Sequence, residues 1–323
     1  MLNKKLGVCI PTFNRDNYLK NCLDSLIPQL IELGLPIYIS DNASTDDTRA
    51  IVSDFQRKYV NIFYNRNDVN LGFAPNVKKV LEMADCEFVW FLGDDDMIND
   101  SAFKKLLEYL EEGFDFLVVN STIFDRNMES VVRERTLNLC CDITIEVGDH
   151  EKLLKTIGDQ ARGYLGFISS IIIRRDLLIK RILENELFLD SDFMQMELFY
   201  KSIVGKRGKV VSHPLIMNRS GNDRIKITTW AWDFPQTLNR LIPEYSKEFI
   251  QDFYNGEMQK AILFSSFLIK YQGNFGLSSL KYSLKNKDEF IAISTKALIY
   301  LIAVFPNFIF KRIFKEYKRL NNN

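Results

Sequence analysis

Three consecutive carboxylates, Asp94, Asp95 and Asp96, are the residues of this chain that most clearly indicate chemistry. They follow five apolar residues and a glycine at 88–93, a run that predicts a strand buried on both faces. In an open α/β sheet, ligands bind at the edge where such strands end. Adjacent carboxylates repel one another unless a cation or hydrogen-bond donors neutralise them, and their hard oxygens suit Mg²⁺ or Mn²⁺. The alternative is a solvated acidic turn before a helix that starts near Ser101.

The pattern of apolar residues predicts the elements that position this cluster. Strand and helix signals alternate over the first third of the chain, as a parallel sheet with crossover helices requires. Strands are predicted at 6–10, 37–39, 62–64, 88–92 and 116–119, and helices at 17–30, 75–83 and 104–111. A further helix is predicted to run through Tyr59, with 44–47 as its capping sequence. Pro11 is expected to stop the first strand. A later strand, 209–212, is predicted to end at His213 and Pro214, with a helix at 192–203 before it and a mobile loop at 218–223 after it.

Composition limits the class of protein. The 323 residues are 46% hydrophobic and 26% charged, which is ordinary for a globular protein. Lys plus Arg equal Asp plus Glu at 42 each, so no overall field favours nucleic acid. The five cysteines lack CxxC spacing and are expected to be reduced thiols of a cytosolic protein. The first strand begins directly after Lys5, and we therefore expect no signal peptide.

Short polar motifs follow each of the first four strands: PTFNR at 11–15, DNASTDD at 41–47, NLGF at 70–73 and GDDD at 93–96. A carboxylate and an amide, Asp41 and Asn42, can read the edge of a pyrimidine. Gly72 allows backbone to approach a ligand closely. Taken singly, each motif is also typical of an ordinary turn, and Ser44 and Asp46 suit a helix cap.

In this order, the four motifs closely resemble those of the family 2 glycosyltransferases, which have the GT-A fold. The resemblance is strong over residues 5–125 and weak over 160–215. The FVWFLGDDD run and the pair Ser169-Ser170 look most like the abequosyltransferase-like branch, which builds bacterial surface polysaccharides. The resemblance to family 2 implies an α/β, Rossmann-like fold with a mostly parallel sheet flanked by helices and a C-terminal helical appendage. We expect a catalytic domain at 1–215, with a nucleotide-binding half at 1–125 and an acceptor half at 126–215.

The resemblance also implies roles for individual residues. Asp96, the last residue of the family's DXD element, is expected to bind Mn²⁺ or Mg²⁺, and Asp94 to contact the ribose or the sugar and share in the metal site. Asp95 stands between them and can share either role. The nucleotide site is expected to contain Pro11, Thr12, Asn14, Arg15, Asp41, Asn42, Asn70, Gly72, Asp94 and Asp95.

A transferase of this kind needs a carboxylate that removes a proton from the acceptor hydroxyl. The family places it at the start of a helix in the second half, which in this chain predicts Asp192, with Asp190 and Glu197 as reserves. The sequence has no clean Glu-Asp pair there, and Asp192 also suits the N-cap of that helix. Arg219 and Arg224, on either side of Gly221, are a hypothetical lid over the donor's diphosphate.

The remaining region, 216–323, is predicted to be a loop followed by helices. Its apolar run at 297–310 is shorter than the roughly 20 residues of a spanning helix, Pro306 interrupts it, and basic residues follow. This pattern predicts a helix that lies on the anionic inner face of the plasma membrane, although packing on the catalytic domain is the plainer alternative.

The sequence thus predicts a cytoplasmic, peripheral glycosyltransferase of the hexosyl- or deoxyhexosyl-transferring class. Its donor would be a UDP-, CDP- or dTDP-linked sugar, its acceptor a lipid-linked oligosaccharide, and its reaction metal-dependent and inverting. Two alternatives stay open. A sugar-phosphate nucleotidyltransferase shares the strand and helix alternation, but it needs a glycine-rich, basic loop after the first strand. A catalytically inactive glycan-binding subunit on the membrane would not need an intact GDDD.

Overall fold

The computed structural model describes residues 3–153, 164–183, 191, 193–221, 237 and 240–248. The chain divides into two compact units, Met1–Asn222 and Asp223–Asn323, and the fold described below is that of the first. The predicted bases Asp190 and Asp192, the lid residue Arg224 and the apolar run at 297–310 lie outside the described residues.

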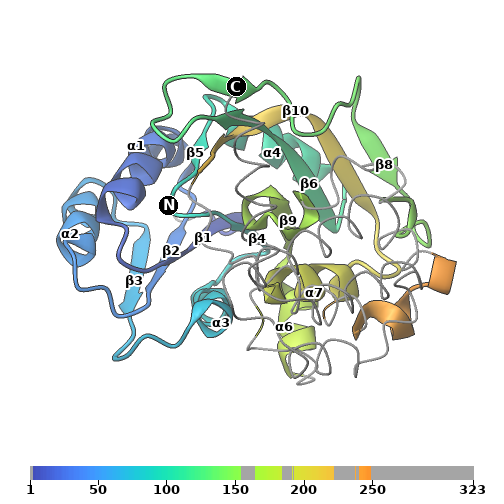
Figure 1. Ribbon diagram of the computed structural model, residues 1–323, viewed down its shortest axis with the longest axis horizontal. Coiled ribbons are helices and arrows are strands. Elements are labelled where there is room, and N and C mark those ends of the chain that lie inside the picture. Colours follow the sequence, from blue (N-terminus) through green and yellow to red (C-terminus); the bar gives the residue numbers. More distant parts are fainter. Residues whose placement is uncertain are drawn as a thin grey trace, which may run out of the picture. The chain divides into compact units, whose positions relative to one another are not determined.

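Strands and helices alternate through the first unit (Figure 1). The described strands are β1 (Leu6–Thr12), β2 (Ile37–Asp41), β3 (Ile62–Arg66), β4 (Phe88–Phe91), β5 (Met97–Ile98), β6 (Phe116–Phe124), β7 (Val131–Arg133), β8 (Ile143–Ile145), β9 (Ile171–Arg174) and β10 (Gly208–Arg219). The described helices are α1 (Asp16–Leu33), α2 (Thr48–Lys58), α3 (Phe73–Met83), α4 (Ala102–Glu111), α6 (Arg175–Leu183) and α7 (Met194–Ser202), with 3-10 turns at Tyr164–Gly166 and Ile168–Ser170.

These strands form one mixed sheet in the order β3-β2-β1-β4-β9-β6-β10-β5, with β7 paired to β6 and β8 to β10. Strands β1 to β4 are parallel. Strand β9 is antiparallel to both β4 and β6, and β10 is parallel to β6. Consequently β6 and β10 run in the same direction as β4. The carboxyl ends of β1, β2, β4 and β10 therefore meet the start of β9 at one edge of the sheet.

Helices cover both faces of the sheet. Alternate residues of β1 (Leu6, Val8, Ile10) belong to a buried apolar cluster that includes residues of α1, α2 and α4, because a strand turns successive side chains to opposite faces. Helix α3 packs on β1 and β2 and contacts α6 and α7, which lie beside it in Figure 1. The sheet is thus buried on both sides, and its polar residues concentrate at the edge.

Two strands extend beyond their predicted ends. Strand β1 continues through Pro11 to Thr12, where it still pairs with β2. β4 pairs with β1 only as far as Cys9, so the missing N–H of Pro11 breaks no ladder bond on that side. Strand β10 likewise continues through Pro214 to Arg219, with shifts of register on either side of Pro214 that absorb the irregularity. The predicted loop at 218–223 therefore begins inside a strand.

The pairing of β10 with β6 depends on a glycine. Gly208 lies opposite Phe116, and a Cβ at this position would stand 2.2 Å from the Phe116 ring. The ring has no space to retreat, since it is buried and packs edge-on against Phe199 at 5.6 Å between centroids.

We therefore predict that Gly208→Ala lowers the free energy of unfolding by about 1–3 kcal/mol, the usual cost of overpacking. Urea denaturation measures the loss. Gly166→Ala is the matched control, because its Cβ would meet Phe193 at an ordinary 3.7 Å. Equal losses in the two variants would contradict the steric argument.

Candidate active site

The three aspartates lie in the loop between β4 and β5, at the edge where the parallel strands end. Asp94 and Asp96 are buried, whereas Asp95 is partly exposed. The loop folds back tightly on Gly93, where a Cβ would lie 3.0 Å from Asp96 Oδ2 and 3.1 Å from Asp95 Oδ1. Because glycine has no side chain, both carboxylates can approach the backbone at position 93 closely.

Asp94 joins the aspartate loop to the end of β1. The Thr12 hydroxyl donates to Asp94 Oδ2 at 2.8 Å, and Arg15 Nη1 lies 3.1 Å from Asp94 Oδ1. The same nitrogen lies 2.6 Å from Asp95 Oδ2, so one guanidinium serves two carboxylates. Burial lowers the pKa of Arg15, but Asp94 and Asp95 outweigh it and leave that pKa raised. Arg15 is thus a permanent positive charge between them.

Asp96 has neutral partners instead. Its Oδ2 accepts from the Ser169 hydroxyl at 2.5 Å, and its Oδ1 accepts from Asn218 Nδ2 at 3.0 Å and from the Arg219 N–H at 3.3 Å. Burial, and next to it the charge of Asp95, raises the pKa of Asp96 to about 7, although these three donors lower it. The negative charge of Asp96 is therefore costly in the protein alone.

Arg219, at the end of β10, is a fixed part of the site. Its Nε donates to the carbonyl of Asp95 at 3.1 Å and its Nη1 to the carbonyl of Arg126 at 2.8 Å. Its guanidinium lies 5.0 Å from the centre of the Tyr18 ring. Nη2 is buried and has no hydrogen-bond partner in the part of the chain that the structure describes. The side chain is buried rather than carried on a mobile loop, so the predicted lid role is wrong for Arg219.

These residues fit a divalent cation that is shared with a substrate. Asp96 is buried and, within the described residues, forms no ion pair, so a cation would offset a charge that neutral donors only partly stabilise. No group of three acidic, histidine or cysteine side chains suited to a metal occurs among the described residues. Within the described residues, Asp96 and Asp94 would supply one or two carboxylates to such a cation. Mg²⁺ is commonly bound in this way, with water and substrate phosphates completing its shell.

A second polar cluster surrounds Asp41, which lies beside Thr12 in the register of β1 and β2. Asp41 is fully buried; its Oδ1 accepts from the Ser44 N–H at 2.8 Å and its Oδ2 from the Tyr64 hydroxyl at 2.6 Å. Arg66 Nε stands 3.9 Å from the same Oδ2. Burial, together with the bond to Asp41, raises the pKa of Tyr64. This hydroxyl is therefore a permanent donor to the carboxylate.

Asn42, Asn70 and Gly72 form one network next to Asp41. Asn42 Nδ2 donates to Asn70 Oδ1 at 2.8 Å and to the Gly72 carbonyl at 3.0 Å, while its Oδ1 accepts from the Leu71 N–H at 2.9 Å. Gly72 has φ +89°, which favours glycine. The contacts of Asn42 hold the loop before α3 in place.

The loop after β1 is tied to the loop after β2. Asn14 has φ +50° and its Oδ1 accepts from the Thr45 N–H at 2.8 Å, while its own N–H donates to Ser44 Oγ at 2.9 Å. The structure thus brings the predicted nucleotide residues into two adjoining clusters, one around Asp94 and one around Asp41. Pro11 lies in β1 next to Thr12, which bonds to Asp94 and lies beside Asp41 in the register.

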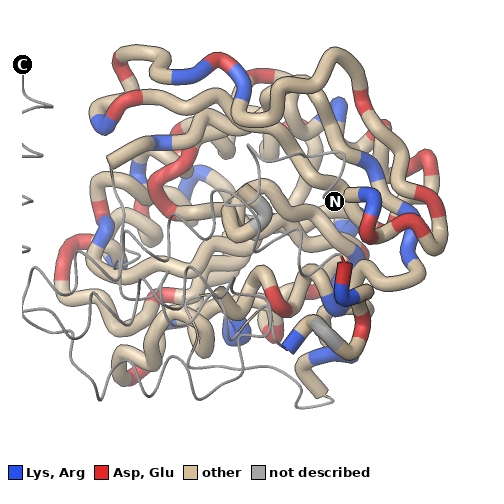
Figure 2. The backbone as a smooth tube through the Cα atoms, turned by 45° about the vertical axis from the view of Figure 1, so that its right-hand side comes forward, with Lys and Arg blue, Asp and Glu red and all other residues tan. Residues whose placement is uncertain are grey.

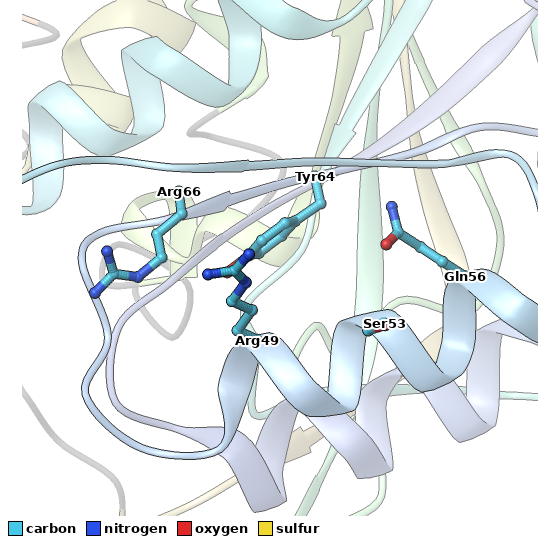
Figure 3. A pocket seen from close by; sticks show the side chains of 5 residues that line it. All are labelled: Arg49, Ser53, Gln56, Tyr64 and Arg66. Atoms are coloured by element: carbon cyan, nitrogen blue, oxygen red, sulfur yellow. The ribbon is translucent and has the colours of Figure 1, made fainter.

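A cleft of about 430 Å³ opens between α2 and β3, beside the Asp41 cluster. It is lined by Arg49, Ser53, Gln56, Tyr64 and Arg66. Figure 3 shows the Arg49 guanidinium beside the Tyr64 ring. Tyr64 therefore separates a basic cleft from the buried Asp41 carboxylate.

Of the three candidates for the base, Glu197 lies among the described residues, in α7. Glu197 is fully buried in this helix, with its Oε1 3.1 Å from Lys201 Nζ. Before the helix, Ser191 Oγ accepts from the Phe193 N–H at 3.0 Å. The choice among Asp192, Asp190 and Glu197 stays a prediction.

Sequence reasoning missed three partners of Asp96: Ser169, Asn218 and Arg219 in its role as a backbone donor. Ser169 was noted as part of the resemblance, but no role was predicted for it. Its position beside Gly93 depends on the antiparallel pairing of β9, which the sequence pattern does not reveal. Like the other site residues, Asn218 and Arg219 lie at the end of a strand, at the ligand-binding edge. They were not recognised because the strand was predicted to end at Pro214.

Basic and acidic residues are interspersed along the described part of the chain (Figure 2). This distribution fits the balanced composition. Among the described residues, no helix is both long and apolar enough to cross a membrane.

The hydrogen bond from Tyr64 to Asp41 can be tested directly. We predict that Tyr64→Phe lowers the free energy of unfolding by about 1.5–3 kcal/mol, because the lost donor serves a buried charged acceptor. Tyr38→Phe is the control, since the Tyr38 hydroxyl donates to the neutral carbonyl of Asp85 at 3.1 Å. Urea denaturation of both variants decides the matter, and a Tyr64 loss no larger than that of Tyr38 would contradict a charged Asp41.

Known structures share this architecture. The Staphylococcus aureus TarS 1–349 structure in complex with UDP-GlcNAc superposes with a TM-score of 0.63 at 18% identity, over 98% of this chain and 92% of that one. The mannosyltransferase PcManGT from Pyrobaculum calidifontis, in complex with GDP-Man and Mn²⁺, gives 0.57 at 13% identity, over 96% and 89%. These similarities confirm the predicted GT-A fold.

Sequence relatives match a shorter part. The abequosyltransferase RfbV of Salmonella typhimurium is 37% identical over 34% of this chain and 34% of its own length. The GalNAc(5)-diNAcBac-PP-undecaprenol beta-1,3-glucosyltransferase of Campylobacter jejuni is 36% identical over 37% of this chain and 38% of its own length. The chain thus spans about a third of the length of these curated relatives. The profile of glycosyl transferase family 2 matches residues 7–181, which is more than half of the chain, and the chain therefore belongs to that family.

Proposed function

We propose that this chain is a glycosyltransferase that transfers a sugar from a nucleotide-diphosphate donor to a lipid-linked glycan acceptor, with Mn²⁺ or Mg²⁺ and with inversion at the anomeric carbon. The observation that carries the proposal is the buried carboxylate of Asp96, which lies beside Asp94 at the ligand-binding edge of the sheet and has only neutral hydrogen-bond partners within the described residues. Membership of family 2 supports the sugar-transfer chemistry.

In this function, the Asp41 cluster would contact the nucleobase and the Asp94 cluster the ribose and the diphosphate. Asp96, with Asp94, would hold the divalent cation, which would spread the charge of the departing diphosphate. Arg219 offers its buried Nη2 at the same place. The oxygen of the acceptor hydroxyl would bond to the anomeric carbon while the bond from that carbon to the diphosphate breaks. Asp192 would accept the proton that this hydroxyl loses.

The nature of the acceptor rests on the relatives. The Campylobacter jejuni relative is named for a substrate linked to undecaprenol through a diphosphate, and the Salmonella relative for transfer of abequose. A role in bacterial surface polysaccharide synthesis, O-antigen included, follows as a proposal for this chain. Peripheral attachment to the inner face of the plasma membrane through the apolar and basic segment at 290–323 remains a prediction.

We predict that Asp96→Asn reduces metal-dependent donor hydrolysis by about 10²-fold or more, because it removes a charged oxygen at the proposed metal. The fold should survive, since Asn keeps the shape and relieves a costly buried charge. Hydrolysis across a panel of nucleotide sugars with added Mn²⁺ gives the activity, and circular dichroism gives the fold. Asp100→Asn, the same change at an exposed neighbour, is the control. Full activity of the Asp96 variant would remove the metal from the proposed reaction.

We further predict that Asp192→Asn lowers turnover by about 10²–10⁴-fold, the usual contribution of a positioned general base, and leaves donor affinity unchanged. Asp190→Asn and Glu197→Gln are the comparison variants. Turnover and KM for the donor separate the roles. If the Asp192 variant loses stability but not turnover, Asp192 is a helix cap, and the comparison variant with the larger loss identifies the base.

A further inference from the structure

The charge balance at the aspartates depends on one side chain. Arg15 Nη1 lies within 3.1 Å of Asp94 Oδ1 and 2.6 Å of Asp95 Oδ2, and the three side chains are 10%, 5% and 19% exposed, respectively. These contacts are shielded from solvent, so salt and water weaken them far less than at a surface. A cation that approaches Asp94 therefore meets a guanidinium already close to that carboxylate.

The second guanidinium of the site is held differently. The Arg219 guanidinium donates to two backbone carbonyls, those of Asp95 and Arg126. If this side chain moved away, both carbonyls would lose a hydrogen bond. The Arg15 guanidinium instead donates to two carboxylates, those of Asp94 and Asp95. Both guanidiniums also contact the Tyr18 ring, at 5.5 Å for Arg15 and 5.0 Å for Arg219. The ring thus offers Arg15 a second favourable contact.

We propose that Arg15 is an internal competitor of the metal: it neutralises Asp94 and Asp95 in the metal-free protein, and the divalent cation must displace its charge in order to bind. Arg15 thereby weakens the binding of metal alone. This inference rests on the proposed function in so far as that function requires a metal at Asp96. It adds that the affinity for the metal is set by a residue that is not a metal ligand.

The test measures Mn²⁺ binding without any donor, by the electron paramagnetic resonance signal of free Mn²⁺. We expect Arg15→Gln to bind Mn²⁺ about tenfold more tightly than the wild type, which corresponds to about 1.4 kcal/mol. Lys20→Gln, which removes an exposed positive charge from α1, the helix that begins directly after Arg15, should leave the affinity unchanged. Damage to the site would weaken binding, so a rise in affinity distinguishes competition from a structural role.

Stability gives an independent readout. In EDTA, Arg15→Gln should melt below the wild type because its buried carboxylates lose their counter-ion, and Mn²⁺ should raise its melting temperature more than that of the wild type. If this variant does not fold, Arg15→Lys replaces it. Its single ammonium cannot match the planar guanidinium between two carboxylates, so its Mn²⁺ affinity should still rise severalfold.

The outcomes separate the two proposals. If the wild type binds Mn²⁺ and the Arg15 variants bind it equally or more weakly, the competitor role is overturned while the metal site stands. If neither the wild type nor any variant binds Mn²⁺, the proposed metal dependence fails, and the competitor role fails with it.

Discussion

The fold places three consecutive carboxylates at the edge of a sheet, two of them buried, and the arrangement of the site follows from the need to stabilise them. Charged groups are rarely buried without partners, because desolvation is expensive. Different partners stabilise the three carboxylates. Asp94 receives the hydroxyl of Thr12 and shares Arg15 with Asp95, while Asp96 receives three neutral donors. These donors come from β1, the loop after it, the turn before β9 and the end of β10, so the site forms only when the whole sheet is assembled.

The antiparallel strand β9 explains how distant segments reach one loop. Because β9 runs against β4 and β6, the turn that precedes it lies at the edge where the parallel strands end. Ser169 then bonds both to the Gly93 N–H and to Asp96, and its carbonyl accepts from the indole N–H of Trp90 at 2.7 Å. The same turn therefore fixes the strand that carries the aspartates and the loop that contains them.

The sequence was sufficient for the parallel half of the fold and for the residues that follow its strands, because apolar strands and polar motifs alternate regularly there. It was insufficient where a proline lies within a strand. Pro11 and Pro214 both appear as strand ends, yet each lies where its missing N–H interrupts little of the ladder. Two partners of Asp96 were missed for this reason, since Asn218 and Arg219 belong to the part of β10 that continues after Pro214. In both strands the end is set by pairing with a neighbouring strand, and a local sequence pattern does not contain that information.

The signs of the charges impose an order on the site. When all three aspartates are ionised, they and the two guanidiniums of Arg15 and Arg219 leave one excess negative charge. In the proposed function, a donor diphosphate is itself negative, so it would meet unfavourable electrostatics in the metal-free protein. A divalent cation at Asp96 would reverse the sign of the excess and make the same position attractive. One divalent ion would suffice, because Arg219 is fixed by carbonyls and Arg15 by the carboxylates. An additional fixed cation would attract the diphosphate without any metal, and the proposed reaction would then lose the ion that stabilises its leaving group.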